Sequence, residues 1–204
     1  MDGDGVPLRE MVALKERFGA WLMLDEAHAT GLYGERGQGL ANAQGVADRI
    51  EIQMGTLGKA LGVSGGYIVG SRKLVDYLVN RARSFIFSTA PPPAVAAAAT
   101  AAVRYVQTPA GQALRHQLWA YVRALASHFP PPGGRPPSAI FPAIVGDEAA
   151  AVALFAALRE RGFFVPAIRY PTVARGAARL RITLTAAHAA EDITALADTL
   201  RLLL

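Results

Sequence analysis

A run of five apolar residues, from Ala20 to Leu24, ends at Asp25 and constrains the fold of this chain more than any other segment. Such an unbroken apolar run is typical of a parallel strand that is buried on both faces of a sheet. The preceding segment, Pro7 to Phe18, has the apolar spacing of a helix, and Gly19 follows as a stop. A helix followed by a buried strand predicts an α/β fold, in which ligands gather at the carboxyl ends of strands. We therefore expect a functional role for Asp25.

The rest of the pattern predicts two domains. Up to residue 128 we expect strands at residues 49–54, 67–70 and 85–87, and helices at 73–83, 94–106 and 110–128. The proline- and glycine-rich residues 130–137 must form a surface loop. Beyond this loop, a β-α-β-β-α pattern covers 139–145, 147–161, 163–168, 180–185 and a last helix from 191. We assign residues 1–103 to part of a large α/β domain and residues 104–204 to a small α+β domain.

Composition excludes several classes of protein. With 52% hydrophobic and 18% charged residues, the chain is not intrinsically disordered. The absence of cysteine excludes a disulfide framework and a thiolate metal site. No segment has the length and apolarity of a membrane span or a secretory signal, so we expect a cytoplasmic protein. The net charge of +5 suits an anionic ligand as well as nucleic acid, and the arginines are dispersed, so charge decides little.

Lys59 lies in a loop crowded with glycines, which let a bulky ligand approach the backbone closely. A lone Gly-Lys would more often be a solvated lysine on a flexible loop. The loop is not a nucleotide P-loop, which requires G-x-x-x-x-G-K-[ST]. Gln53 stands where the first glycine is needed, and Ala60 replaces the Ser or Thr that would bind magnesium. Thr56, three residues before the lysine, offers a hydroxyl to a phosphate oxygen.

The segment Asp25-Glu26-Ala27-His28 has three possible interpretations. The same four letters form the second motif of a class of helicases, but that function needs a P-loop upstream and only 24 residues precede Asp25. The acid could also simply cap a turn at the end of the strand. Together with Lys59, the segment suits a site for pyridoxal 5′-phosphate (PLP). The lysine amine would form a Schiff base with the cofactor, and Asp25 would keep its pyridine nitrogen protonated.

Three motifs together resemble the α-oxoamine synthases. They are the segments 25–31, 34–39 (Gly-Glu-Arg-Gly-Gln-Gly) and 55–60 (Gly-Thr-Leu-Gly-Lys-Ala), and the resemblance extends through segments 87–92, 167–173 and 178–188. These enzymes have the fold of the aspartate-aminotransferase-like, fold-type-I PLP-dependent transferases. Chains of the family are about twice as long, so the resemblance implies that this chain is the C-terminal half, with the phosphate-cradling backbone and the ring-stacking residue in the missing half.

The resemblance assigns cofactor roles to four residues of the first part. Lys59 forms the internal Schiff base and then moves the proton at the α-carbon of the substrate. Asp25 pairs with the pyridine nitrogen of PLP. His28 hydrogen-bonds the ring hydroxyl and acts with Lys59 in catalysis. Thr56 holds the phosphate.

The resemblance also assigns roles beyond this cofactor site. Ser88 and Thr89 reach the phosphate of a neighbouring subunit's cofactor, which implies a homodimer. Thr172 lines the substrate pocket, and Arg181 binds the carboxylate of the amino acid through two parallel hydrogen bonds. From the residues alone Arg179 would be an equally good candidate, and either arginine could be a surface residue on an edge strand.

The resemblance implies an acyltransferase that condenses an amino acid with an acyl-coenzyme A and releases carbon dioxide. The C-terminal segments favour L-alanine and a pimeloyl thioester as substrates. Alternatives are a member that uses glycine with an acetyl thioester, and an inactive fragment that folds poorly or binds a chain carrying the other half. Neither nucleic acid nor a membrane is an expected partner.

Overall fold

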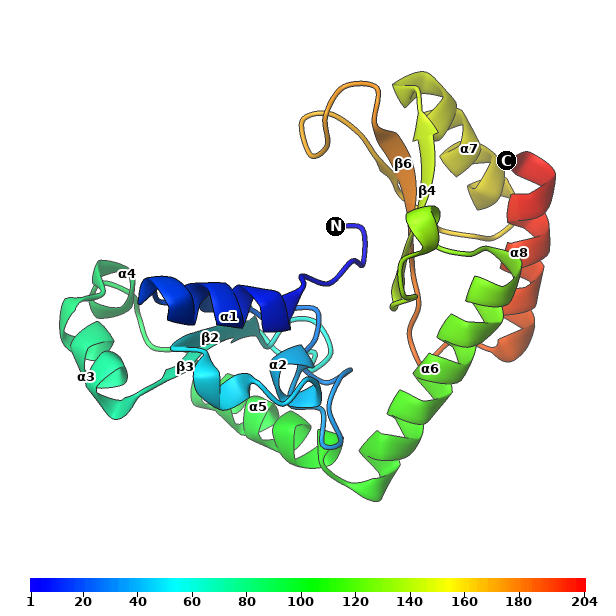
Figure 1. Cartoon of the computed structure of the whole chain (residues 1–204). Helices are drawn as coiled ribbons and strands as arrows, with labels where there is room; N and C mark the ends of the chain where they lie inside the picture. Colours follow the sequence, from blue (N-terminus) through cyan, green and yellow to red (C-terminus); the bar gives the residue numbers. More distant parts are fainter. The chain divides into compact units, whose positions relative to one another are not determined.

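The computed structural model describes residues 1–204, which form two compact units (Figure 1). The first unit comprises Val6–Arg115. The second unit comprises Met1–Gly5 together with His116–Leu204, so the first five residues belong with the C-terminal part of the chain. This division by contacts lies within a helix, and the domain boundary after residue 103 stays a prediction. No helix has the length and apolarity required to cross a membrane.

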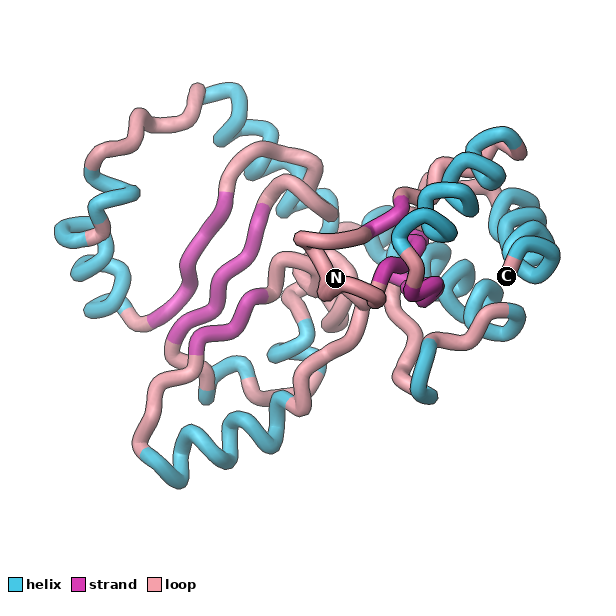
Figure 2. Tube along the Cα trace, turned by 90° about the horizontal axis from the view of Figure 1, so that it is seen from above, coloured by secondary structure: helices cyan, strands magenta, loops and turns pink.

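The first unit contains a three-stranded sheet in the order β1-β2-β3, and Figure 2 shows its strands side by side. The strands are β1 (Met23–Asp25), β2 (Ile52–Thr56) and β3 (Gly66–Gly70). β1 and β2 are parallel, as expected for the first strand, whereas β3 is antiparallel to β2. The helical elements of the unit are α1 (Leu8–Phe18), α2 (Leu40–Ala43), η1 (Ala47–Arg49), α3 (Arg72–Arg81), α4 (Arg83–Ile86) and α5 (Pro93–Val106).

Only one face of the first strand is buried, contrary to the prediction. Leu22 belongs to a core cluster with Leu8 and Val12 of α1, but Trp21 and Met23 are 70% and 56% exposed. Successive side chains of an extended segment point to opposite faces. The apolar run therefore alternates between the α1 side and a side on which Trp21 and Met23 are exposed.

The expected strand at residues 85–87 is also wrong. This segment forms α4 and the turn that follows it, in which the Ser88 hydroxyl donates to the carbonyl of Ser84. The guanidinium of Arg83 lies over the ring of Phe87, 5.5 Å from its centroid. Three apolar residues are too short a run to distinguish a strand from a helical turn.

The second unit is an antiparallel sheet in the order β4-β6-β5, packed with helices. Its strands are β4 (Ile140–Gly146), β5 (Ala167–Ile168) and β6 (Ala178–Thr183), and its helical elements are α6 (Pro109–His128, which begins in the first unit), η2 (Pro132–Gly134), α7 (Glu148–Glu160) and α8 (Ala190–Leu203). The Asp147 carboxylate accepts the N–H of Ala150 at 2.7 Å and so caps α7. Phe141, Leu180 and Leu200 are at most 1% exposed and form part of the core.

Candidate cofactor and substrate site

The parallel pair β1 and β2 places Asp25 and Thr56 at the same edge of the sheet. Asp25 is the last residue of β1 and is opposite Met54 in the register. The N–H of Glu26 continues the pairing by donating to the carbonyl of Met54 at 2.7 Å. The Asp25 carboxylate accepts the N–H of Ala27 at 2.8 Å and is otherwise exposed. A carboxylate is therefore oriented at the carboxyl end of a strand, where ligands of α/β folds bind.

Lys59 projects from an ordered loop beside Thr56. Its ammonium nitrogen donates to Thr56 Oγ1 at 3.3 Å, and its side chain is exposed. Backbone hydrogen bonds close the loop: Leu57 N–H to the Gly65 carbonyl at 2.9 Å and Val63 N–H to the Leu57 carbonyl at 2.9 Å. Gly65 has φ of +131°, which a side chain rarely permits. The amine and the hydroxyl that we predicted to share a ligand are thus neighbours.

His28 is exposed in the turn that follows β1. Two hydrogen bonds to the carbonyl of Glu26, from the N–H groups of Ala29 and Thr30, both at 2.9 Å, define this turn. The turn therefore carries the imidazole three residues beyond Asp25, at the same end of the strand.

Glu26 has a structural role that the sequence analysis missed. It is 3% exposed, and its two carboxylate oxygens accept the N–H groups of Leu40 at 2.9 Å and Ala41 at 2.7 Å. A buried carboxylate satisfied by two backbone donors ties the turn after β1 to the start of α2. Gly39 is required there, because an added Cβ would lie 2.9 Å from Glu26 Cδ. The adjacent acids of the motif thus differ in role, one buried and one exposed.

Tyr67 also has a structural role that could not be recognised in the sequence. Its hydroxyl lies 2.6 Å from Thr30 Oγ1, and a Cβ added to Gly55 would be 2.4 Å from that hydroxyl. Gly55 is therefore required by a tyrosine on the neighbouring strand. The same Thr30–Tyr67 pair helps to line a hollow of ≈ 580 Å³ in the first unit, which Lys59, Asp25 and His28 do not line.

Ser88 and Thr89 are exposed in the segment between α4 and α5. No hydrogen bond joins either side chain to Lys59; the Ser88 hydroxyl is bonded to the Ser84 carbonyl. The structure places both hydroxyls where another molecule can reach them.

Thr172 and Arg181 belong to the second unit. Thr172 lies in the turn before β6, where its N–H donates to the Arg169 carbonyl at 3.0 Å. Arg181 lies on β6 between Leu180 and Ile182, both of which are buried, so its side chain is on the less buried face. Its Nε donates to the carbonyl of Met1 at 3.0 Å.

The residues at the β1–β2 edge fit PLP by their chemistry. An amine can bind the aldehyde, a carboxylate can pair with the pyridine nitrogen, and a hydroxyl and an imidazole can bind the phosphate and the ring hydroxyl. Lys59, Asp25, His28 and Thr56 supply this set from two neighbouring strand ends. The side chain of the lysine is exposed.

Comparisons with known proteins identify the family of this chain. The profile of the family described as aminotransferase class I and II matches residues 1–200. An 8-amino-7-oxononanoate synthase from Anaeromyxobacter dehalogenans is 52% identical over 194 residues, which are 95% of this chain and 49% of that protein. The chain spans about half the length of the curated relatives it matches.

Solved structures confirm the predicted fold class. A variant serine palmitoyltransferase from S. paucimobilis, solved with a bound PLP–myriocin aldimine, has a TM-score of 0.91 and 30% identity over 100% of this chain and 52% of that one. An 8-amino-7-oxononanoate synthase from Francisella tularensis has a TM-score of 0.77 and 25% identity over 94% of this chain and 57% of that one. The resemblance drawn from the motifs is therefore confirmed as well.

Proposed function

Because this chain belongs to the aminotransferase class I and II family, we propose that it supplies the C-terminal half of the site of a PLP-dependent acyltransferase, 8-amino-7-oxononanoate synthase. The observation that carries the proposal is the amine of Lys59 beside the hydroxyl of Thr56, at the strand edge where Asp25 ends its strand. The reaction would be the decarboxylative condensation of L-alanine with a pimeloyl thioester, a step of biotin synthesis in the cytoplasm.

The residues of the first unit would hold the cofactor and move one proton. When bound, PLP supplies an electron sink for negative charge at the α-carbon of an amino acid. Lys59 would carry the cofactor through its amine and later take the α-proton of alanine. Asp25, oriented by the N–H of Ala27, would keep the pyridine nitrogen protonated. Thr56 would bind the phosphate, and His28 would hold the ring hydroxyl.

The residues of the second unit would bind the amino acid. Arg181 would donate hydrogen bonds from its guanidinium to the alanine carboxylate, which fixes the orientation of the bond that breaks when carbon dioxide leaves. Thr172 would line the same substrate pocket. Ser88 and Thr89, which are exposed in the first unit, would bind the phosphate in the partner subunit of a homodimer.

An absorbance spectrum of the 204-residue chain with added PLP tests the proposal. We expect a visible band that shifts when L-alanine is added, and that is absent in Lys59→Ala. Lys73→Ala is the matched control, because Lys73 is an exposed lysine of the same unit on α3. Borohydride reduction and peptide mass spectrometry should place the label on Lys59. A label that is spread over the lysines, or a band that survives in Lys59→Ala, would contradict the proposal.

A second candidate is another α-oxoamine synthase with a different amino acid. The higher TM-score with a serine palmitoyltransferase, 0.91 against 0.77, is the observation that favours it. A titration with L-alanine, glycine and L-serine separates the candidates. The quantity compared is the concentration of each amino acid that half-saturates the spectral shift. Tightest binding of alanine supports the first proposal, and preference for glycine or serine supports the second.

A further inference from the structure

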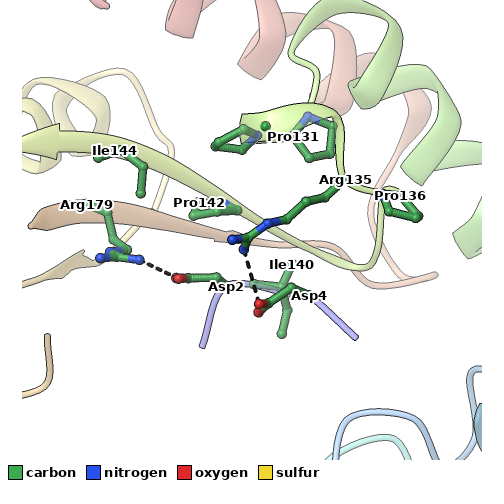
Figure 3. A pocket seen from close by; sticks show the side chains of 12 residues that line it. Asp2, Asp4, Pro131, Arg135, Pro136, Ile140, Pro142, Ile144 and Arg179 are labelled. Atoms are coloured by element: carbon green, nitrogen blue, oxygen red, sulfur yellow. Dashed lines mark hydrogen bonds and ion pairs between the residues drawn. The ribbon is translucent and has the colours of Figure 1, made fainter. Parts of the chain in front are cut away.

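Met1–Gly5 form a strap against β4 and β6 of the second unit, and two ion pairs hold it there. Figure 3 shows Asp2 directed at Arg179 and Asp4 at Arg135. The distances are 2.5 Å for Asp2 to Arg179 and 3.1 Å for Asp4 to Arg135. Between the two acids, Gly3 has φ of +73°, and an added Cβ would lie 2.4 Å from a backbone carbonyl of β4. The strap is therefore fitted to this surface.

Each of the three nitrogens of the Arg179 guanidinium already has a partner, which leaves two of its five N–H groups without one. Its Nε and Nη2 donate to the carbonyl of Ala177 at 3.0 and 2.9 Å, and its Nη1 donates to Asp2 Oδ2 at 2.5 Å. The two side chains of the ion pair are 12% and 26% exposed. An ion pair this sheltered is screened less than a surface pair. Asp2 thus neutralises Arg179 and occupies the end of its guanidinium.

Arg181 is two residues further along β6 and so lies on the same face as Arg179. Only its Nε has a partner, the carbonyl of Met1. That bond fixes the plane of the guanidinium, and the two terminal nitrogens remain without a hydrogen bond. They form the edge that binds a carboxylate through two parallel hydrogen bonds.

We propose that the strap selects Arg181, rather than Arg179, as the arginine that binds the substrate carboxylate. The proposal rests on the proposed function and identifies Asp2 as a positioning residue. A released Arg179 would offer a second carboxylate site about 6.6 Å along the strand, at the rise of two residues. An amino acid bound there would have its carboxylate displaced by that distance from its position on Arg181.

Arginine-directed labelling tests the selection without any cofactor. The chain is treated with phenylglyoxal, and the labelling rates at Arg179 and Arg181 are read by peptide mass spectrometry. We expect Arg181 to react and Arg179 to be protected, and propionate to slow the labelling of Arg181. Asp2→Asn should raise the rate at Arg179 by about fivefold or more, since it removes a charge-assisted partner. Asp4→Asn is the matched control and should expose Arg135 alone. Equal rates at Arg179 and Arg181 in the unmodified chain, or an unchanged rate at Arg179 in Asp2→Asn, would overturn the proposal.

A second measurement separates selection from a purely structural role. With PLP bound, Asp2→Asn should raise the L-alanine concentration for half-saturation of the spectral shift by about fivefold. Adding Arg179→Gln to that variant should restore the value, because the competing guanidinium is then gone. If the double variant binds L-alanine as weakly as Asp2→Asn does, the proposal that the strap selects Arg181 is contradicted. Failure of the unmodified chain to bind PLP would count against the proposed function only, since the labelling result stands without it.

Discussion

The two units differ in what their helices cover. In the second unit every long helix buries side chains, for example Leu125 on α6, Leu158 on α7 and Leu200 on α8. In the first unit α3, α4 and α5 bury none. A helix that buries no apolar face depends on its own hydrogen bonds and is marginal in water. Both units have a buried core, but the core of the first unit includes residues of α1 and none of α3, α4 or α5, so the unit that carries Lys59 leaves much apolar surface open.

Two phenylalanines give the sharpest test of this comparison. Phe141 in the second unit is 0% exposed, and Phe87 in the first is 76% exposed. We expect Phe141→Ala to lower the free energy of unfolding by about 3–5 kcal/mol and Phe87→Ala to change it by less than about 0.5 kcal/mol.

Each unit contains one tryptophan, Trp21 in the first and Trp119 in the second. Urea denaturation of Phe141→Ala can therefore be followed by Trp119 fluorescence in a Trp21→Phe background, and that of Phe87→Ala by Trp21 fluorescence in a Trp119→Phe background. Equal losses in the two alanine variants would show that the two units do not differ in this way.

Removing a helix cap should also destabilise the second unit more than the first, but by a smaller amount than removing a buried phenylalanine. Asp147 caps α7, which buries Ala151 and Leu158, whereas Ser71 caps α3 by accepting the N–H of Leu74 at 3.2 Å. Asp147→Ala should lower the free energy of unfolding of the second unit by about 1 kcal/mol. Ser71→Ala should leave the global value nearly unchanged and instead speed amide hydrogen exchange in α3, which can open locally. Slower exchange in α3 than in α7 in the unmodified chain would contradict the comparison.

The smallest expected effect is on the pH dependence of the stability of the first unit. A hydrogen bond from Lys15 at 2.6 Å, and another from the N–H of Leu22 at 2.9 Å, lower the pKa of Glu51 to about 2. Because this pKa lies below the value of 4.5 for an unperturbed glutamate, the stabilisation is present above pH 4.5 and is lost as pH falls towards 2. Glu51→Gln should reduce the pH dependence of thermal unfolding in that window.

The matched control is Glu10→Gln, on the same helix as Lys15, because the Glu10 side chain makes no hydrogen bond or ion pair. Added salt should weaken the contribution of Glu51, since the pair is partly exposed. If Glu51→Gln and the unmodified chain have the same pH dependence, the Lys15–Glu51 pair does not contribute to the pH dependence of the stability of the first unit.

Much of the fold and part of the site could be predicted from local patterns. Glycine stops, proline starts and apolar spacing placed most helices, and the apolar run before Asp25 predicted the parallel strand. The neighbouring positions of Lys59 and Thr56 follow from three residues of spacing on one loop. These features depend on residues close together in the sequence.

Features that depend on distant residues could not be predicted. The exposure of Trp21 depends on what covers the sheet, which a run of apolar letters cannot show. The difference between Arg179 and Arg181 arises from Asp2 and Met1, and Asp2 is 177 residues away from Arg179 in the sequence. Arg179 also has two local hydrogen bonds, to the carbonyl of Ala177, and the strap adds to each arginine a partner that is distant in the sequence.

The strap has a consequence for the order of events during synthesis. Arg135 and Arg179, which hold Met1–Gly5, are separated from these five residues in the sequence by the whole first unit and are translated after it. The two ion pairs of residues 1–5 therefore cannot form until more than a hundred further residues have been translated. During that time the exposed apolar surface of the first unit is already present. Pairing across so long a loop carries an entropic cost and slows folding. The growing chain is thus most exposed to aggregation before its last strand, β6 with Arg179, has been translated.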